Sequence, residues 1–407
     1  MKKIMKKAVF SLYYIKYMPG ISIKNASRNK RELSAAHEFG FRTVVFSGDK
    51  PGSVRTPEFI DRQVWEGTEA LDETIPKWKF WFRAWRNRFI LFYRTMRLPI
   101  GVWSCHDLSA LSVAYRVTRF RIRKPILIYD SHEFEMGRNV RRTKEEAEEI
   151  KRKERFYIDR CAFTIVVNDS IADEVQRIHE LKQRPVVVRN TPDNWKIDES
   201  VCADRRAAFM DEFRQKGSEV SFLAMYHGGM MRNRGIEPLI KAAAKTEGIG
   251  LVLLGSGEEN YVAAIRRLIG DYGMADRVLF YPLVPLEELW KYLGAVDVGV
   301  MPIETVVKNH YYSLPNKFFE SIQSLTPIIA SDIPEMRRLV DKYQIGLTCR
   351  PGDPEDISRC IAQLRDDPIF YARCKENLKR AKEELCWEKE KQVLLKAYRD
   401  HFGELKN

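Results

Sequence analysis

The 407-residue chain lacks several features that would each assign it to a class. No apolar run approaches the about 20 residues that a helix needs to span a bilayer. The seven cysteines are odd in number, scattered and without a C-x-x-C pair, which argues against a disulfide framework or a cysteine zinc site and favours reduced thiols. No G-x-G-x-x-G follows the first apolar segment, so dinucleotide binding has little support.

What is present describes a folded protein with a basic surface. Hydrophobic residues make up 44% of the chain and charged residues 31%, which is typical of globular domains. The net charge of +13 favours anionic partners such as phosphorylated substrates, an acidic membrane surface or nucleic acid. The lysine-rich start MKKIMKKAVFSLYYIKY has only a short apolar core and no clear cleavage site, so we interpret it as a first strand. We therefore expect a cytoplasmic protein.

Strand-like and helix-like segments alternate along the chain and predict an α/β protein with two doubly wound domains facing a cleft. We place the first domain at residues 1–190 and the second at 191–387, and the apolar stripe of a terminal helix at about 388–407 suits packing back on the first, although any amphipathic terminal helix would show one. Regular structure breaks at Asn190, and the polar stretch from there to Gly217 is expected to be the connection between the domains.

Polar residues follow three expected strands of the first domain. The loop after the first strand offers Lys24, Asn25 and Arg28. Two later strands each deliver a histidine and a carboxylate to their carboxyl ends, which is the edge where open α/β sheets bind ligands. Most single histidines are structural, but two placed in this way favour a site. These residues are His106, Asp107, Asp130, His132 and Glu133.

Residues 76–99 combine an aromatic stripe at helical spacing with many basic residues. One interpretation is an amphipathic helix that packs on its own domain. The other is a helix that lies in an anionic membrane interface, with the aromatic rings in the headgroup region. Nucleic-acid binding ranks lowest because no nucleic-acid motif accompanies the stretch. The aromatic residues in question are Trp78, Trp81, Trp85, Phe89 and Phe92.

The second domain contains two stretches that suit a phosphorylated ligand. Gly228 and Gly229 end a strand and precede a loop with Arg232 and Arg234, where backbone and guanidinium groups can approach phosphate. Further on, Pro315 precedes a helix whose buried face is marked by Phe318, Phe319, Ile322 and Leu325, with Asn316 as its expected cap. The start of such a helix suits a diphosphate, although an ordinary capped helix would give the same local pattern.

The stretch LPNKFFESIQSLTPIIASDIPE resembles the donor-site signature of the family 4 (group 1) glycosyltransferases, which have the GT-B fold. The motifs HD-L-x-A-L and DSHE of the first half are similar to the same family. The resemblance implies that Glu320 binds the ribose of a nucleotide-sugar donor and that Arg234 takes the place of the family's diphosphate-binding lysine. The family's first glutamate of E-x7-E is replaced here by Tyr312.

The resemblance implies a glycosyltransferase that moves a sugar from a nucleotide-sugar donor to a glycan or lipid-linked acceptor in cell-surface polysaccharide biosynthesis. We expect it to be retaining and metal-independent and to need no cofactor, which fits the lack of a D-x-D motif. A noncatalytic GT-B subunit and a UDP-sugar epimerase are the alternatives. The expected location is the cytoplasm, at the inner face of the membrane if 76–99 binds lipid, with no nucleic-acid partner.

The resemblance also distributes roles over the candidate residues. The expected catalytic residues are His132, Arg234 and Lys317. The expected donor-binding residues are Gly228, Gly229, Arg232, Val284, Leu314, Pro315, Asn316 and Glu320. The expected acceptor-side residues are His106, Asp107, Asp130 and Glu133, and no metal ligand is expected.

Overall fold

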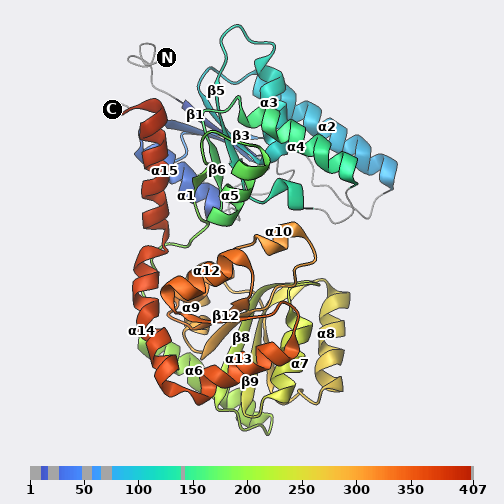
Figure 1. Ribbon diagram of the computed structural model, residues 1–407, viewed down its shortest axis with the longest axis vertical. Coiled ribbons are helices and arrows are strands. Elements are labelled where there is room, and N and C mark those ends of the chain that lie inside the picture. Colours follow the sequence, from blue (N-terminus) through green and yellow to red (C-terminus); the bar gives the residue numbers. More distant parts are fainter. Residues whose placement is uncertain (1–10, 17–26, 48–56, 66–75, 139–142, 405–407) are drawn as a thin grey trace. The chain divides into compact units, whose positions relative to one another are not determined.

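The computed structural model describes residues 11–16, 27–47, 57–65, 76–138 and 143–404 (Figure 1). The chain divides into two compact units. Unit 1 runs up to Arg189 and takes in the segment from Glu390 onward, and unit 2 is Asn190–Lys389. Lys24 and Asn25, which were candidates for the first loop, lie outside the described residues.

The described part of unit 1 contains a seven-stranded parallel sheet in the order β3-β2-β1-β4-β5-β6-β7. Its strands are β1 Ser11–Lys16, β2 Arg42–Ser47, β3 Arg62–Trp65, β4 Val102–His106, β5 Ile126–Ser131, β6 Thr164–Val166 and β7 Val186–Val187. All of β4 and nearly all of β5 are buried, as expected for strands covered on both faces. The order reverses between β1 and β4, which makes this the switch point of a doubly wound sheet.

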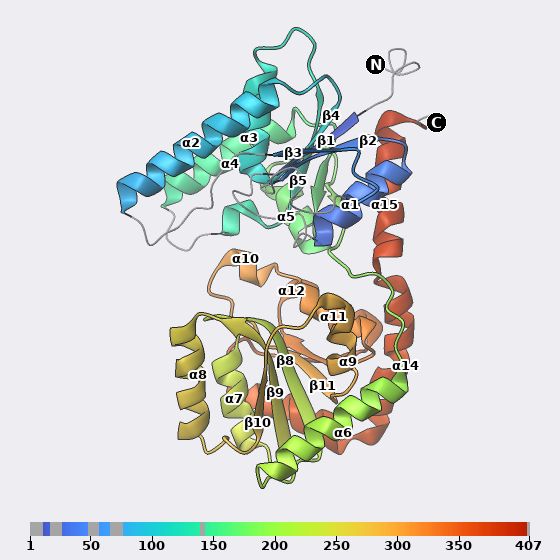
Figure 2. The ribbon, with the colours of Figure 1, turned by 180° about the vertical axis from the view of Figure 1, so that it is seen from behind.

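Helices cover both faces of this sheet, with α2, α3 and α4 on one face and α1 and α15 on the other (Figures 1 and 2). Tyr398 of α15 packs its ring against Phe39, Phe41 and Phe163. The last helix therefore belongs to the core of unit 1. The helices are α1 Ser27–Glu38, α2 Lys77–Met96, α3 Asp107–Thr118, α4 Lys144–Ile158, α5 Asp169–Ile178 and α15 Trp387–Phe402, with a 3-10 turn at Glu135–Gly137.

The described part of unit 2 contains a six-stranded parallel sheet in the order β10-β9-β8-β11-β12-β13. Its strands are β8 Phe222–Met230, β9 Ile249–Gly257, β10 Val278–Tyr281, β11 Val298–Met301, β12 Ile328–Ser331 and β13 Gly346–Cys349. The order reverses between β8 and β11, so this unit repeats the winding of unit 1. The two sheets together confirm the predicted doubly wound α/β class.

The helices of unit 2 form layers on both faces of its sheet (Figure 2). Apolar residues of α7, α8 and α13 form one core layer, and residues of α6 and α9 form another. Helices α11, α12 and α14 surround a third apolar cluster. The helices are α6 Glu199–Gln215, α7 Ile236–Lys245, α8 Glu259–Asp271, α9 Leu289–Leu293, α10 Lys308–Tyr311, α11 Asn316–Gln323, α12 Pro334–Tyr343, α13 Pro354–Asp366 and α14 Pro368–Glu384, with a 3-10 turn at Leu286–Glu288.

The expectation of a polar connection up to Gly217 was wrong. Residues Glu199–Gln215 form helix α6, which the Asp198 side chain caps by accepting hydrogen bonds from two backbone N–H groups. Phe209 and Phe213, four residues apart, are fully buried in the core of unit 2. The charged residues between these two aromatic residues concealed a helical stripe in the sequence.

Candidate functional site

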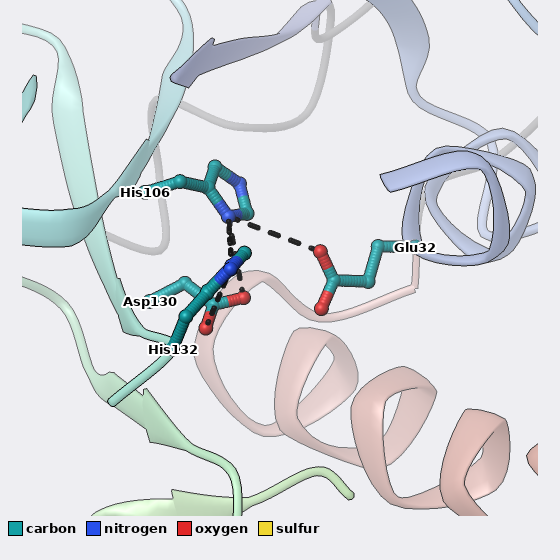
Figure 3. A group of neighbouring side chains, drawn as sticks. All are labelled: Glu32, His106, Asp130 and His132. Atoms are coloured by element: carbon teal, nitrogen blue, oxygen red, sulfur yellow. Dashed lines mark hydrogen bonds and ion pairs between the residues drawn. The ribbon is translucent and has the colours of Figure 1, made fainter. Parts of the chain in front are cut away.

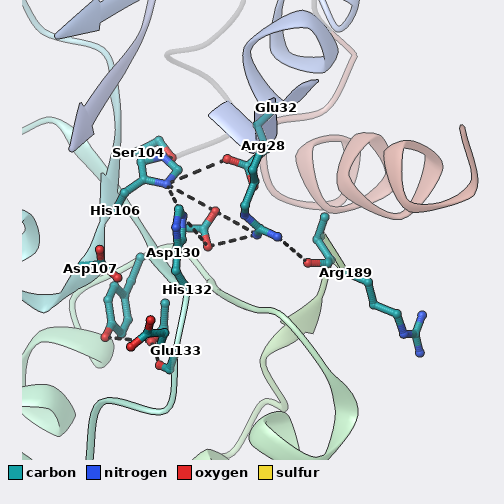
Figure 4. Close-up of polar contacts among 12 residues, drawn as sticks. Arg28, Glu32, Ser104, His106, Asp107, Asp130, His132, Glu133 and Arg189 are labelled. Carbon is teal, nitrogen blue, oxygen red and sulfur yellow. Dashed lines mark hydrogen bonds and ion pairs between the residues drawn. The ribbon is translucent and has the colours of Figure 1, made fainter. Parts of the chain in front are cut away.

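The carboxyl ends of β4 and β5 in unit 1 carry a cluster of polar side chains (Figure 4). His106 ends β4, Asp130 lies in β5, and His132 directly follows β5. Helix α1, which follows β1, adds Arg28 and Glu32. The cluster therefore lies at the switch point of the sheet, where open α/β sheets bind ligands.

The two histidines of this cluster contact each other directly. His106 Nδ1 lies 3.0 Å from His132 Nε2, and His106 Nε2 lies 3.0 Å from Ser104 Oγ. Tyr14 stacks on the His106 ring with the ring centroids 3.6 Å apart. These contacts fix the His106 ring in its plane and in its orientation toward His132.

Arg28 joins the two carboxylates of the cluster. Its Nε lies 2.7 Å from Glu32 Oε1, and its guanidinium lies 3.3 Å from Asp130 Oδ1. Tyr14 donates a hydrogen bond of 2.8 Å to Glu32 Oε2. Burial raises the pKa of Asp130 well above its usual value, and the neighbouring Glu32 raises it further, against the opposing effect of Arg28.

The expectation that His106 and Asp130 contact an acceptor needs correction, since each is only 1% exposed and is held within the cluster. The side chain of His132 is 15% exposed, and it is the histidine of the pair that reaches the surface. Arg28 proved to be a cluster residue, and Glu32 was missed. A signal for Glu32 existed, because it lies four residues after Arg28 on a helix.

Asp107 and Glu133 lie beside the buried cluster and are tied by one arginine that the sequence reasoning missed. Arg138 lies 2.9 Å from Asp107 and 3.0 Å from Glu133. Asp107 begins α3 with a φ of 69°, in the left-handed region that a residue with a side chain seldom adopts. The side chains of Asp107 and Glu133 are 20% and 51% exposed, so both remain accessible to a ligand.

In unit 2 the second group of candidate residues surrounds the ends of β8 and β11. Gly228 adopts a φ of +103°, and a Cβ there would lie 3.6 Å from Lys317 Nζ. A Cβ on Gly299 of β11 would lie 2.6 Å from Ser321 Oγ, so a glycine is needed for α11 to pack against β11. These glycines bring the start of α11 close to the end of β8.

The first turn of α11 has the open N-terminus that the sequence suggested, but its cap is different. Pro315 is the cap residue, and no side chain accepts a hydrogen bond from the first backbone N–H groups. Asn316 is the first helical residue, and its Oδ1 accepts a hydrogen bond of 2.8 Å from Asn190. The expectation that Asn316 caps the helix was therefore wrong, and the helix start remains suited to an anion.

Lys317 is the most perturbed basic group of this site. Its Nζ lies 3.8 Å from the centroid of the Tyr226 ring. Burial and the positive charge of Arg234 together lower the pKa of Lys317 to about 7, against the opposing effect of Glu320. The ammonium group therefore lacks sufficient negative charge around it, and an anionic ligand would supply that charge.

Glu320 lies one turn into α11 and is held by a histidine that the sequence analysis missed. His227 Nε2 lies 2.8 Å from Glu320 Oε2, and His227 is buried at the end of β8. The signal was its position directly before the two glycines. His227 fixes one carboxylate oxygen of Glu320, and the side chain of Glu320 is 14% exposed.

The remaining donor-site candidates differ in how well the structure brings them together. The charge of Arg234 acts on both Lys317 and Tyr226, which places Arg234 near this site. Arg232 instead lines a cavity of about 410 Å³ together with Lys241 and Glu304.

The apolar candidates Leu314 and Val284 differ in how far they are buried, and Tyr312 stands where the family pattern has a glutamate. The side chain of Leu314 is part of the buried core around α11, and its donor-binding role stays a prediction. Val284 packs partly against the core around α6 and remains partly exposed. Tyr312, at the family's first-glutamate position, ends the short helix α10.

Helix α2 presents an aromatic surface in unit 1. Trp78, Trp81, Trp85 and Phe89 are each more than half exposed. Helix α2 does pack on its own unit, but through a face that buries Asn87, Leu91 and Thr95, and these four rings lie outside that face. Three arginines and several of these rings line a groove of about 710 Å³ between α2 and α3: Trp85, Arg88, Phe89, Phe92, Val113, Arg116, Arg119 and Phe120.

Comparison with protein families identifies the second unit. Residues 210–381 match the model described as glycosyl transferases group 1. The chain carries a group 1 glycosyltransferase domain. All of the donor-site candidates, from Gly228 to Glu320, lie inside this domain, and the histidine cluster of unit 1 lies outside the matched residues.

Curated relatives align with about half of the chain. A lipopolysaccharide core biosynthesis glycosyltransferase of Rhizobium meliloti (strain 1021) is 26% identical over 218 residues, covering 51% of this chain and 61% of the relative. The chain spans between half and two thirds of the length of the first curated relatives it matches.

Two solved structures match nearly the complete chain. Sucrose-phosphate synthase from Thermosynechococcus elongatus aligns with a TM-score of 0.75 at 17% identity, covering 96% of this chain and 99% of its own. Anabaena HepE in complex with UDP-glucose aligns with a TM-score of 0.70 at 14% identity, covering 96% and 100%. These likenesses show the two-domain GT-B fold. Among the described residues, none of the helices is both long and apolar enough to cross a membrane.

Proposed function

We propose that the protein is a glycosyltransferase that takes a sugar from a nucleotide-sugar donor and transfers it to a glycan or lipid-linked acceptor of a cell-surface polysaccharide. One observation carries the donor part of this proposal. Inside the group 1 domain, the uncapped start of α11 carries Lys317, and this lysine lies close to Gly228 of β8. The lipopolysaccharide relative supports the acceptor class, and the UDP-glucose complex of HepE supports a nucleotide-sugar donor.

The donor would be bound by groups of opposite charge to its diphosphate. We assign the diphosphate to the backbone N–H groups at the start of α11, to Lys317 and to Arg234, and the ribose diol to Glu320. When the sugar leaves, negative charge grows on the diphosphate, and these preorganised donors stabilise it. The positive end of the α11 dipole acts in the same direction. No metal ion is needed at the diphosphate in this scheme, and retention of the sugar configuration follows from the family resemblance.

In unit 1 we assign the acceptor side to His132, with Asp107 and Glu133 as polar contacts at the same sheet edge. His132 is the exposed histidine of the pair, and His106 holds its Nε2 through the 3.0 Å contact. A hydrogen bond from the imidazole to the acceptor hydroxyl would orient that hydroxyl for transfer.

The first experiment is a thermal-shift screen with UDP-, GDP-, ADP- and CMP-linked sugars. We expect one nucleotide to raise the unfolding temperature, because a ligand that binds only the folded state stabilises it. Hydrolysis or transfer of that donor sugar would then establish an enzyme. Stabilisation without any turnover would instead favour a noncatalytic subunit, which the replacement of the first glutamate by Tyr312 allows, and epimerisation of the sugar would favour an epimerase.

A matched pair of variants tests the basic loop. Arg234→Ala is expected to lower turnover by about 10- to 100-fold, because a charge-assisted hydrogen bond to phosphate is worth about 1.5–3 kcal/mol. Arg232→Ala is the control, since Arg232 lies in the same loop but lines the cavity with Lys241 and Glu304. Equal losses in the two variants would contradict the assignment of the diphosphate to Arg234.

We also propose that α2 attaches the protein to an anionic membrane surface, which would place it at the inner face of the membrane. The exposed tryptophans supply headgroup-level anchors, and Arg88, Arg116 and Arg119 supply cations for lipid phosphates. Trp81→Ala combined with Trp85→Ala should release the protein from phosphatidylglycerol vesicles. Ile369→Ala removes an even more exposed apolar residue, on α14, and should have no effect. A wild-type protein that does not bind these vesicles would refute the membrane assignment.

A further inference from the structure

Four side chains of unit 1 meet around a common point. They are Glu32, His106, Asp130 and His132, and one ligand atom of each lies within 4.8 Å of the others. Figure 3 shows the four side chains pointing toward one another from α1, from the end of β4 and from the end of β5. Three of the four are buried, and His132 reaches the surface.

The donor atoms are those that a zinc ion prefers. Zinc binds imidazole nitrogen at about 2.0–2.1 Å and carboxylate oxygen at about 2.0–2.2 Å, so a tetrahedron separates its ligand atoms by about 3.3–3.5 Å. In this cluster His106 Nδ1 lies 3.0 Å from His132 Nε2 and 3.5 Å from Asp130 Oδ2. His132 Nε2 lies 3.6 Å from Asp130 Oδ1, and Glu32 Oε2 lies 3.9 Å from His106 Nδ1. The four ligand atoms all lie within 4.8 Å of one another, so closing their separations by up to about 1.4 Å would complete the tetrahedron.

Neighbouring groups orient these side chains in the way that outer-shell partners do in metal sites. Ser104 Oγ contacts the second ring nitrogen of His106, so Nδ1 is the nitrogen that points into the cluster. Tyr14 donates a hydrogen bond to Glu32, and Arg28 contacts the other oxygen of the same carboxylate. Ligating carboxylates and histidines are usually held by such contacts.

The charges of the cluster also favour a bound cation. Among the described residues that form its ion pairs, Arg28 is the only permanently charged cation, and it contacts both Glu32 and Asp130. One guanidinium is thus shared between two buried carboxyl groups, and buried carboxylates are usually paired with cations or coordinate a metal ion. A divalent ion between the two imidazoles and the two carboxylates would supply a second positive charge.

We propose that Glu32, His106, Asp130 and His132 bind one zinc ion in unit 1. The ion ties helix α1 to the ends of β4 and β5 and holds His132 through its Nε2. The site is separate from the proposed chemistry at the donor diphosphate, which belongs to unit 2 and uses basic residues instead of a metal. The inference is therefore independent of the donor chemistry, and it shares only His132 with the proposed acceptor side.

The experiment uses the full chain without a histidine tag. The protein is stripped with a chelator, titrated with zinc sulfate, and its metal content is measured after gel filtration. We expect one zinc per chain and a higher unfolding temperature of the loaded protein. Cobalt(II) in place of zinc should give the visible absorption of a four-coordinate ion.

Two histidine variants separate this site from binding elsewhere, for example at the seven cysteines. His132→Ala should weaken zinc binding by more than about 100-fold, because even outer-shell partners are worth about 10- to 100-fold. His37→Ala removes an exposed histidine of the same helix α1 that carries Glu32 and should bind zinc like the wild type.

Two outcomes would overturn the proposal. One is a stripped wild-type chain that takes up no zinc at micromolar concentrations, which would leave a hydrogen-bonded pair of histidines in its place. The other is zinc uptake that His132→Ala leaves unchanged, which would assign the ion to other residues. Circular dichroism of His132→Ala checks that the variant is folded, and the wild-type titration does not depend on that check.

Discussion

The two units share one winding pattern and use it for different chemistry. Both sheets are parallel and reverse their order next to the first strand, at β1 and β4 in unit 1 and at β8 and β11 in unit 2. At the first switch point, carboxylates, histidines and Arg28 form a buried cluster. The second switch point has glycines, an uncapped helix start and Lys317. The positive charge of Lys317 and of the helix start has little negative charge around it.

The two switch points differ in which partners the fold itself provides for their charged side chains. In unit 1 the fold itself supplies the partners of Asp130 and Glu32, so this cluster contributes to the stability of the unit. In unit 2 burial and Arg234 lower the pKa of Lys317, so an anionic ligand would stabilise its charged form. Variants of the first cluster should therefore affect folding most, and variants of the second should affect ligand binding most.

The largest effect is expected from Arg28→Met in the metal-free protein. This variant leaves Glu32 and Asp130 buried without their cation, and removal of one partner from a buried pair costs about 3–5 kcal/mol. The free energy of unfolding, measured by urea denaturation, should fall by that amount. Arg177→Met is the control, because the Arg177 side chain is 70% exposed in its pair with Glu174 and should cost less than about 1 kcal/mol. Equal costs would show that the unit 1 cluster does not stabilise the fold.

Glu320→Ala should change ligand binding and leave folding nearly unchanged. Loss of a charge-assisted hydrogen bond to the ribose is worth about 1.5–3 kcal/mol, so the nucleotide affinity should fall by about 10- to 100-fold. Isothermal titration with the nucleotide that stabilises the wild type measures this affinity. Glu376→Ala, an exposed site on α14, should bind like the wild type. Unchanged affinity of Glu320→Ala would remove this residue from the donor site.

Because of the lowered pKa of Lys317, donor binding should weaken as the pH rises. In the free protein the pKa is lowered to about 7, so Lys317 is mostly neutral above that pH. A bound diphosphate stabilises the ammonium form and raises the pKa, so binding above pH 7 takes up a proton. The nucleotide affinity should be nearly constant below pH 7 and fall by at most about tenfold per pH unit above it. Lys317→Met should bind weakly and without this slope, and a wild-type affinity that rises with pH would contradict the assignment.

The smallest effect is expected from His227→Phe, which keeps an aromatic ring but removes the hydrogen bond to Glu320. Loss of one such bond costs about 0.5–1.5 kcal/mol, so nucleotide affinity should fall by about 2- to 12-fold. If His227 acts by holding Glu320, the double variant with Glu320→Ala should bind no more weakly than Glu320→Ala alone. Independent, additive losses would show that His227 acts in some other way.

Much of the fold could be predicted because its signals are local. The buried strand β12 and the apolar face of α11 appear in the sequence as an apolar run and as helical spacing. The two histidines could be paired in advance, since both follow neighbouring parallel strands, and the structure brings their ring nitrogens to 3.0 Å. Helix α6 was missed because charged residues surround Phe209 and Phe213.

The partners of the site residues were harder to find because they come from distant parts of the chain. Glu320 contacts His227, which lies 93 residues away, and Asp130 contacts Arg28, which lies 102 residues away. Local patterns carry no information on such pairs. The exposure of the α2 aromatic residues was also open, because an amphipathic stripe is the same whether protein or lipid covers it.

The sequence by itself determined the doubly wound class, the alternation of strands and helices outside α6, and the residue types at the two sheet edges, because periodicity, glycines and helix starts are properties of short segments. Only the tertiary structure decided that Asp130 is buried in an ion pair and that His132 is exposed. It also decided that Lys317 lies against Tyr226 with a lowered pKa. Burial and electrostatic surroundings depend on which segments meet in space, and that is settled when the helices pack on the sheets.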